Sequence, residues 1–146
     1  MKKLITIFLS IPEGTFIRKL EENDSELCNS IWEFSYGGSE TFVRSLILIN
    51  GGYGVFDKTS HKLLSFAIIN DHFATGILTT IKEARGKKYG ELVANVLTKK
   101  IAVDLDLTPT VYVNSKNVPS LNLYKKLGYQ RIGDCNWVVV GDKKLW

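Results

Sequence analysis

The segment ILTTIKEARGKKYGELVANVL, residues 77–97, contains the change of pattern that decides the fold. Its first part is rich in β-branched residues, which are typical of strands. Its last part places Leu92, Val93 and Leu97 at helical spacing. Between the two lies a basic corner, RGKKYG (85–90). The segment therefore predicts a strand that leads through a short loop into the start of a helix.

This basic corner has the features of an anion site. The first N–H groups of a helix lack intrahelical partners and point outward together. Gly86 and Gly90 allow the backbone to approach a ligand closely, and Arg85, Lys87 and Lys88 add positive charge. Phosphate is the natural guest, and a diphosphate would engage several amides at once. On this hexapeptide alone, a solvated basic turn without a ligand is an equally good interpretation.

Three common nucleotide-binding patterns do not fit this corner. A P-loop needs GxxxxGK followed by Ser or Thr, and a dinucleotide-binding turn needs GxGxxG; neither is present. The stretch KKYGELV (87–93) lacks the alternating aromatic residues of RNA-binding sheets. A net charge of +4 suits an anionic ligand but does not by itself indicate nucleic acid.

Length and composition indicate one globular domain over residues 1–146. Apolar residues make up 45% of the chain and charged residues 23%, which excludes a disordered tail or a coiled coil. No run approaches the ~20 apolar residues that span a bilayer, so we expect a soluble cytoplasmic protein without membrane contact. The opening MKKLITIFLS (1–10) imitates a signal peptide but lacks a cleavage pattern, and residues 1–12 are interpreted as a leading strand or linker.

The two cysteines, Cys28 and Cys135, lie far apart and form neither a CxxC pair nor a Cys/His cluster. This arrangement predicts no zinc site and no disulfide framework. Both are interpreted as reduced, buried thiols.

Periodicity and turn residues predict the remaining elements. Strands are expected at 14–20, 53–57, 62–70, 73–81, 110–114, 129–133 and 136–140. Helices are expected at 21–34, 39–50, from the basic corner to about residue 105, and at 117–128. The buried faces of the first two helices are predicted to carry Leu27, Ile31 and Phe34, and Phe42, Leu46 and Ile49. The result is a mixed α/β (α+β) fold, a mostly antiparallel sheet flanked by about four helices.

Two segments together resemble the GNAT superfamily of N-acetyltransferases. LTTIKEARGKKYGELV (78–93) resembles its loop pattern R/Q-x-x-G-x-G/A. NVPSLNLYKKLGY (117–129) matches its second signature, N-x-x-[AS]-x-x-L-Y-x-K-L-G-F/Y, almost letter for letter. The likeness is greatest to the glycine N-acyltransferase-like branch and extends from about Pro12 to CNWVVV (135–140). Proteins of that branch tend to carry a further N-terminal half, so the chain is expected to correspond to their C-terminal catalytic domain.

The resemblance implies a GNAT-like fold and acetyl-CoA, or another acyl-CoA, as cosubstrate, with no metal. Backbone amides of the loop would hold the pyrophosphate, and the strand before the loop would offer backbone groups to the pantetheine arm. The residues implied in cofactor binding are Leu78, Thr79, Thr80, Arg85, Gly86, Lys87, Lys88, Tyr89, Gly90, Asn114, Asn117, Ser120 and Tyr124. Helix capping alone explains Asn117 equally well. The family usually has Gly where this chain has Lys88, so the side chain there would either crowd the diphosphate or add charge to it.

For the chemistry, the resemblance assigns two catalytic residues. Tyr124 would act as the general acid that protonates the leaving thiolate, and the backbone N–H of Leu78 would stabilise the developing oxyanion. Core packing is the alternative interpretation of Tyr124, because it shares an apolar helical stripe with Leu121 and Leu127.

A general base is harder to assign. Ala74 occupies the strand position where related acyltransferases place a glutamate, and Asp71 and His72 stand just before it. Asp71 or His72 would accept the proton of the amine, or the proton leaves by a water-mediated route, or no general base acts. Family placement implies substrate contacts for Glu33 and Tyr36, and His72 joins them as the third candidate.

The leading hypothesis is an acyl-CoA-dependent N-acyltransferase that transfers an acyl group to a primary amine of a small molecule or amino acid within a ternary complex. The alternatives are a CoA-binding module without turnover, a protein or peptide N-acetyltransferase, and a basic nucleic-acid binder. We expect a monomer or homodimer in the cytoplasm, with a mitochondrial location implied by family analogy.

Overall fold

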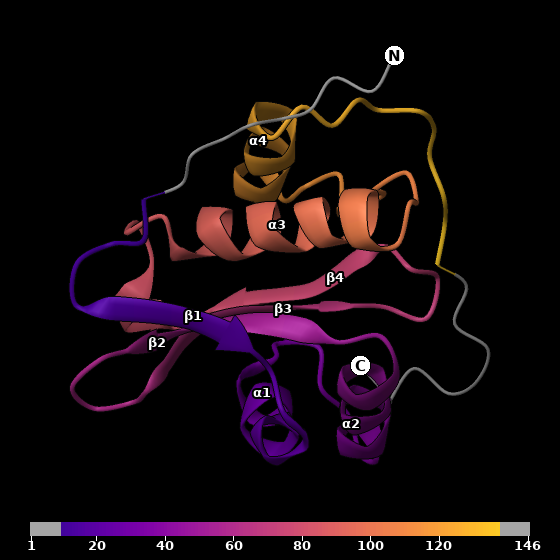
Figure 1. The fold of residues 1–146 in the computed structure, drawn as a ribbon. Coiled ribbons are helices and arrows are strands. Elements are labelled where there is room, and N and C mark those ends of the chain that lie inside the picture. Colours follow the sequence, from indigo (N-terminus) through magenta and orange to yellow (C-terminus); the bar gives the residue numbers. More distant parts are fainter. Residues whose placement is uncertain (1–9, 138–146) are drawn as a thin grey trace.

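A computed structural model describes residues 10–137 of the chain and contains a four-stranded antiparallel sheet (Figure 1). The strands lie in sequence order: β1 (Thr15–Lys19), β2 (Gly52–Asp57), β3 (Leu63–Ile69) and β4 (Thr75–Thr80). Each strand is antiparallel to its neighbour. This order follows from the short turns between β2, β3 and β4, since short connections join antiparallel neighbours.

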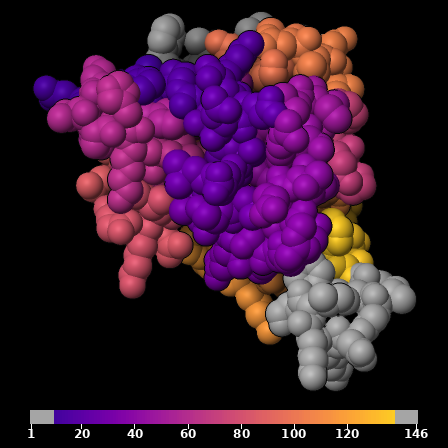
Figure 2. Space-filling model, turned by 90° about the horizontal axis from the view of Figure 1, so that it is seen from below, coloured from indigo at the N-terminus to yellow at the C-terminus, as the bar shows by residue number. Residues whose placement is uncertain are grey.

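Helices cover both faces of the sheet, two on each side (Figure 1). They are α1 (Ser25–Ile31), α2 (Ser39–Ile49), α3 (Tyr89–Lys99) and α4 (Val118–Lys126). Short helical turns precede α1 (Glu22–Asp24) and α3 (Lys82–Ala84), and a π-helical turn (Lys100–Asp104) follows α3. The space-filling view shows α1 and α2 spread over one face (Figure 2). Within residues 10–137, no helix combines the length and the apolarity that crossing a bilayer requires.

The apolar core is divided by the sheet into two layers. Between the sheet and α1 and α2, the fully buried members include Cys28, Val43, Phe66 and Ile68. Beneath α3 the buried residues are Val55, Ala67, Ile69, Ala84, Tyr89, Leu92, Val93, Leu97 and Ile101. The alternation of Phe66 and Ile68 with Ala67 and Ile69 along β3 is what a strand covered on both faces produces. The expected mixed α/β class with an antiparallel sheet and four helices is confirmed.

The predicted faces of the first two helices are partly wrong. Leu27 and Phe34 are exposed, and Phe34 lies beyond the end of α1, because that helix begins only at Ser25 and ends at Ile31. Its buried side chain is Cys28. In α2 the buried stripe is Val43, Leu46 and Ile47, while Ile49 is exposed and Phe42 is half-buried. The face that each helix buries against the sheet is therefore rotated by about one residue from the predicted face.

The late strands are also shorter than expected. The 110–114 segment contributes a single parallel bridge, Thr75 to Val111, and residues 129–133 form no strand. The predicted strand at 136–140 lies mostly outside the described residues, as do residues 1–9 of the expected leading segment. Cys135 is exposed, so the prediction of a buried thiol is wrong there, whereas Cys28 is buried and free.

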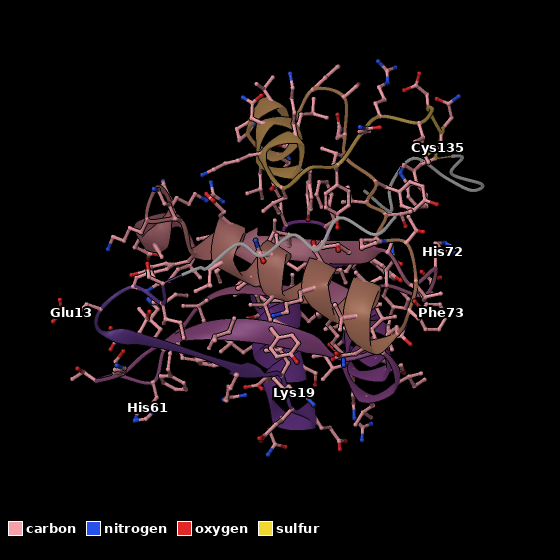
Figure 3. All side chains as sticks on the ribbon, turned by 45° about the horizontal axis from the view of Figure 1, so that its top comes forward. Glu13, Lys19, His61, His72, Phe73 and Cys135 are labelled. Carbon is pink, nitrogen blue, oxygen red and sulfur yellow. The ribbon has the colours of Figure 1, made fainter. Side chains whose placement is uncertain are left out.

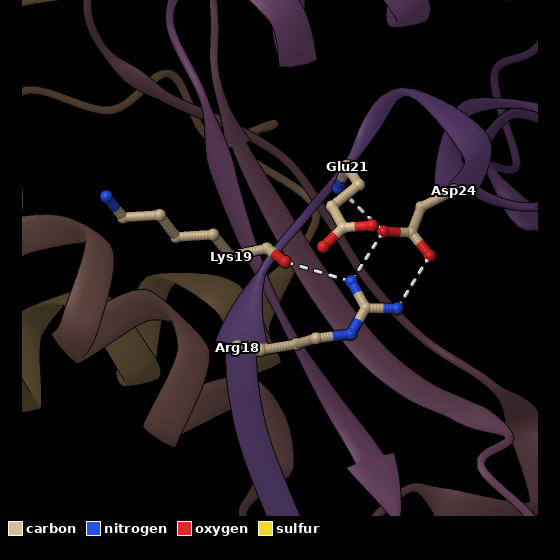
Figure 4. A network of polar contacts seen from close by, with 4 residues as sticks. All are labelled: Arg18, Lys19, Glu21 and Asp24. Carbon is tan, nitrogen blue, oxygen red and sulfur yellow. Dashed lines mark hydrogen bonds and ion pairs between the residues drawn. The ribbon is translucent and has the colours of Figure 1, made fainter.

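An ion pair fastens the end of β1 to the turn before α1 (Figure 4). The guanidinium of Arg18 donates to both carboxylate oxygens of Asp24, at 2.7 and 2.9 Å, and also to the Lys19 carbonyl at 2.9 Å. Asp24 in turn accepts from the Glu21 N–H at 2.7 Å. The other side of the guanidinium lies 4.0 Å from the centre of the Phe56 ring. Burial raises the pKa of Asp24, but the hydrogen bonds from Arg18 and Glu21 outweigh it and lower that pKa below its usual value.

Candidate active site

The basic corner forms a tight turn between β4 and α3. The backbone of Gly86 has φ 78°, and that of Lys88, the residue before the first turn of α3, has φ 66° and ψ 12°. Both values lie in the left-handed region, which costs a side-chain-bearing residue free energy. Lys88 therefore occupies a position that favours glycine, which gives a physical reason for the glycine usual there in the GNAT pattern.

The amides of this turn are available to a ligand. Leu92 donates to the Lys88 carbonyl, which closes the first helical hydrogen bond of α3. Among residues 10–137, no carbonyl or side chain accepts a hydrogen bond from the N–H groups of Lys87, Lys88, Tyr89 or Gly90. Successive amides in a turn that reverses handedness form a concave anion-binding surface. We call residues 85–90 the cradle.

Positive charge gathers at the cradle. The side chains of Arg85, Lys87 and Lys88 are all exposed. The nearest acidic residue along α3, Glu91, forms an ion pair with Lys126 of α4, with 2.7 Å between Nζ and Oε1. This pair neutralises Glu91 and joins the start of α3 to the end of α4. Sequence reasoning missed it, because nothing in the local pattern links two residues so far apart.

Close packing places the cradle against the end of β4. A Cβ atom added at Gly90 would lie 3.2 Å from the Thr80 hydroxyl oxygen. That hydroxyl is 2.8 Å from the hydroxyl of Ser65 on β3, which also donates to the Thr79 carbonyl at 3.1 Å. The Arg85 Nε donates to the Thr80 carbonyl at 3.2 Å. The Thr80 hydroxyl thus bonds to β3 and the Thr80 carbonyl holds the Arg85 side chain, roles that the sequence pattern did not indicate.

Strand β4 carries a β-bulge just before the cradle. Its register with β3 runs from Phe66 opposite Thr79 to Ile68 opposite Gly76, so β4 contains one extra residue between these pairs. Ile77, within the bulge, has φ 47°, a rare conformation for a β-branched residue. A bulge removes backbone groups from the ladder and re-aims a side chain. The bulge includes Leu78, the residue whose N–H was predicted to stabilise an oxyanion.

Next to the bulge, the sheet opens. The Thr75 N–H donates to the Thr110 carbonyl at 2.9 Å, and Thr75 pairs with Val111 in parallel. Beyond this bridge, no further pairing joins β4 to the segment up to Asn114, as far as the described residues extend. Backbone pairing between the two segments therefore ends at this bridge, and β4 continues from it toward the cradle. Backbone groups that are left unpaired in this way can pair with an extended ligand.

Tyr124 lies in a small core beside this opening. It is only 5% exposed and packs with Ala94 and Leu127, and Leu78 of the bulge packs against the same cluster. The two predicted catalytic residues thus meet in one cluster, although they lie far apart in sequence. The ring of Tyr129 makes a T-shaped contact with Tyr124, 5.1 Å between centroids. Burial raises the pKa of the Tyr124 hydroxyl above its ordinary value, so the group is protonated at neutral pH.

The polar residues of the 114–120 segment are engaged locally. The side chain of Asn114 accepts from the Lys116 N–H at 2.9 Å, and that of Asn117 caps α4 by accepting from the Ser120 N–H at 3.2 Å. Capping therefore accounts for the side-chain oxygen of Asn117. Gly128, with φ 92°, follows the end of α4 as predicted.

The acceptor-side candidates do not gather with the cradle. Glu33 and Tyr36 are exposed in the connection between α1 and α2, and His72 is exposed in the β3–β4 turn. Figure 3 shows His72 and Phe73 together at one end of the molecule, opposite Glu13 and His61. Ala74, at the position expected for a glutamate, is fully buried.

Similar solved structures share this architecture. A Drosophila protein aligns with a TM-score of 0.81 and 26% identity over 85% of this chain, which corresponds to 42% of that protein. Glucosamine-6-phosphate N-acetyltransferase from Arabidopsis thaliana aligns with a TM-score of 0.68 and 17% identity, over 88% of this chain and 100% of the enzyme. A predicted acetyltransferase from Clostridium acetobutylicum, solved with acetyl-CoA, aligns with a TM-score of 0.64 and 15% identity, over 87% and 96%.

No curated protein matches the chain. The family pattern described as FR47-like protein matches residues 52–138, from β2 to beyond α4. This region includes the cradle, the bulge and Tyr124. With its fold shared by GNAT acetyltransferases and its sequence matched over more than half of its length, the chain belongs to the FR47-like protein family.

Proposed function

We propose that this protein is an acyl-CoA-dependent N-acyltransferase that acts on a primary amine of a small molecule or amino acid. The observation that carries the proposal is the run of four amides from Lys87 to Gly90, which have no partner within residues 10–137. They follow a bulged strand whose Leu78 shares a cluster with Tyr124. A phosphate site, an open backbone edge and a buried proton donor are the three parts that transfer from a CoA thioester requires.

In this proposal the cradle amides hold the CoA diphosphate, with Arg85 and Lys87 supplying charge-assisted contacts. The pantetheine arm enters the gap between β4 and the 111–114 segment and pairs with backbone groups of Leu78 and Thr80. Asn114 and Ser120 would contact the cofactor from the far side of the gap. The acyl carbonyl would then lie at the bulge.

The reaction proceeds by direct attack. The amine nitrogen forms a bond to the thioester carbon, and the carbonyl π electrons move to oxygen, where the Leu78 N–H stabilises the negative charge. The intermediate collapses, the C–S bond breaks, and the thiolate takes a proton from the Tyr124 hydroxyl. The raised pKa keeps Tyr124 in its donating form. The excess proton of the amine leaves to a base such as His72 or Asp71, or to water, and reprotonation of Tyr124 closes the cycle.

The finer assignment rests on the motif from Asn117 to Tyr129, which supports the glycine N-acyltransferase-like branch. In that case the chain corresponds to one catalytic domain of a longer protein, consistent with its match to 42% of the Drosophila protein. The free thiols of Cys28 and Cys135 suit a reducing compartment, and we place the protein in the cytoplasm.

A second candidate function is a CoA-binding module without turnover. It is favoured by Ala74, a buried methyl group where a catalytic carboxylate would stand. Both candidates predict acyl-CoA binding, so only turnover separates them.

Binding comes first in the test. Calorimetric titration with acetyl-CoA should give saturable binding, and Arg85→Glu should abolish it by reversing the charge at the cradle. Arg131→Glu is the matched control, because Arg131 is an equally exposed arginine on another segment, paired with Asp134. Release of CoA thiol in the presence of an amine panel then distinguishes enzyme from module. Absence of acetyl-CoA binding by the folded protein would refute both.

A further inference from the structure

The β3–β4 turn is built to hold a fixed shape. The Asn70 side chain accepts from the N–H groups of His72 and Ala74, at 3.0 and 2.9 Å. The Asn70 carbonyl accepts from the Asn50 side chain at 2.7 Å and from the Phe73 N–H at 3.0 Å. Phe73 has φ 56°, an unfavourable conformation for a bulky residue that persists only where its surroundings enforce it. The turn therefore presents its residues in one arrangement.

This turn displays a continuous row of polar and aromatic groups. Asp71 Oδ1 lies 3.6 Å from His72 Nε2. The His72 ring makes a T-shaped contact with Tyr112, 6.3 Å between centroids, and Tyr112 makes another with Trp137, at 6.0 Å. All four side chains are exposed, and they come from three separate segments. Exposed rings from distant segments therefore meet at the surface beside a carboxylate.

The row lies at the β4 edge of the sheet, where Val111 pairs with Thr75. Val111 and Val113 pack against the cluster of Ala94, Tyr124 and Leu127 between α3 and α4. Side chains alternate along an extended segment, so Tyr112 points to the opposite side, where it contacts His72. Tyr112 is thus one residue from the bridge at which β4 and the 111–114 segment begin to separate. The row thus begins next to this bridge, on the side of the 111–113 segment away from Tyr124.

We propose that Asp71, His72, Tyr112 and Trp137 form a recognition site for an alkylammonium group of the acceptor. Aromatic faces attract organic cations through their quadrupoles, and Tyr and Trp are the strongest side chains for this. The Asp71 carboxylate adds the opposite charge, and the His72 ring extends the row. This inference rests on the proposed function, because it takes the bound cation to be part of the amine substrate. That substrate would carry a cationic group in addition to the amine that reacts.

Binding of the cation alone tests the site without any catalysis. Tetramethylammonium chloride is titrated into the protein without acyl-CoA, against sodium chloride at equal ionic strength. The readout is the NMR signal of the Trp137 indole N–H, assigned with a Trp137→Phe variant. We expect a saturable shift of that signal and none for Trp32, which lies with α1. Asp71→Asn and Tyr112→Leu should each weaken binding by about fivefold.

Asp104→Asn is the matched control, because Asp104 is as exposed as Asp71 but lies after α3, paired with Lys100. It should leave the affinity unchanged. No saturable shift, or equal weakening by Asp104→Asn, would overturn the inference. So would equal binding of a neutral tert-butyl alcohol, which would make the row a general apolar patch.

Turnover separates this inference from the proposed function. With aminoethyl-trimethylammonium and its neutral tert-butyl analogue as acceptors, we expect a lower KM for the cation, and we expect Asp71→Asn to remove that preference. Saturable cation binding without turnover of any amine would sustain the recognition site and refute the enzyme. Turnover without cation binding and without a preference for the cationic acceptor would support the enzyme and refute the recognition site.

Discussion

At the scale of single residues, Tyr124 is either a core residue or a general acid, and the structure allows the two roles to be distinguished. Its ring is buried in the cluster with Ala94 and Leu127, as a core residue would be. Its hydroxyl has no hydrogen-bond partner within residues 10–137, whereas the hydroxyl of the neighbouring Tyr129 lies 2.8 Å from that of Thr98. A hydroxyl without a protein partner adds no hydrogen bond to the stability of the fold, so its presence favours a role with a ligand.

Replacing Tyr124 with phenylalanine should therefore reduce turnover without unfolding the protein. We expect kcat to fall by about 100-fold, the usual contribution of a general acid, with the free energy of unfolding unchanged. Tyr129→Phe is the control. It should cost about 1 kcal/mol of stability through the lost hydrogen bond while kcat persists. Equal turnover in the Tyr124→Phe variant would assign Tyr124 to the core alone. Steady-state thiol release and urea unfolding supply both measurements.

The strained backbone at Lys88 gives a second prediction at this scale. Lys88→Gly should raise the free energy of unfolding by about 1 kcal/mol, since glycine adopts positive φ without the Cβ penalty. Lys87→Gly removes the same charge from a neighbouring residue whose φ is not positive, and it should bring no gain. Urea denaturation of the two variants decides between them. A similar change in both would show that charge, not backbone strain, governs this turn.

At the scale of elements, the attachment of β1 to α1 depends on the Arg18–Asp24 pair. The contact is bidentate, and Asp24 is largely buried, but Arg18 is about one-third exposed, which moderates the interaction by solvent screening. We expect Asp24→Asn to cost about 1–2 kcal/mol. In the exposed Arg131–Asp134 pair one guanidinium nitrogen contacts both carboxylate oxygens, at 2.6 Å each, and Asp134→Asn should leave the melting temperature unchanged. If Asp24→Asn and Asp134→Asn change the stability equally, burial does not strengthen the Arg18–Asp24 pair.

Sequence patterns predicted the elements whose signals are local and missed those set by packing. Alternation located β1, and composition with turn residues located β2 to β4. Asn117, Pro119 and Gly128 bounded α4, because turns and caps depend on neighbouring residues. The phase of α1 was missed, since its burial depends on where the sheet lies. The bulge at Ile77 has no sequence signal either: the same residues would form a regular strand. The meeting of Leu78 with Tyr124 was expected only from the family resemblance.

At the scale of the whole molecule, global stability should depend on pH through Cys28. Burial raises the pKa of its thiol to about 12, so the folded state holds this proton when the unfolded state has released it. Because the folded pKa is the higher one, the stabilisation is complete below the unfolded pKa of about 9 and is lost as pH rises toward 12. Over that range the wild type should lose up to about 1.4 kcal/mol more per pH unit than Cys28→Ala. Parallel curves from denaturant unfolding would contradict this.

The central claim is that the cradle amides bind the diphosphate of CoA. The most direct measurement is the chemical shift of the amide groups of Lys87, Lys88, Tyr89 and Gly90 during titration with acetyl-CoA and, separately, with acetyl-pantetheine, which lacks the diphosphate. We predict large shifts of these four amides with acetyl-CoA, and shifts confined to the β4 bulge around Leu78 with acetyl-pantetheine. If acetyl-CoA binds and the four amides do not respond, the diphosphate lies elsewhere and the account is wrong.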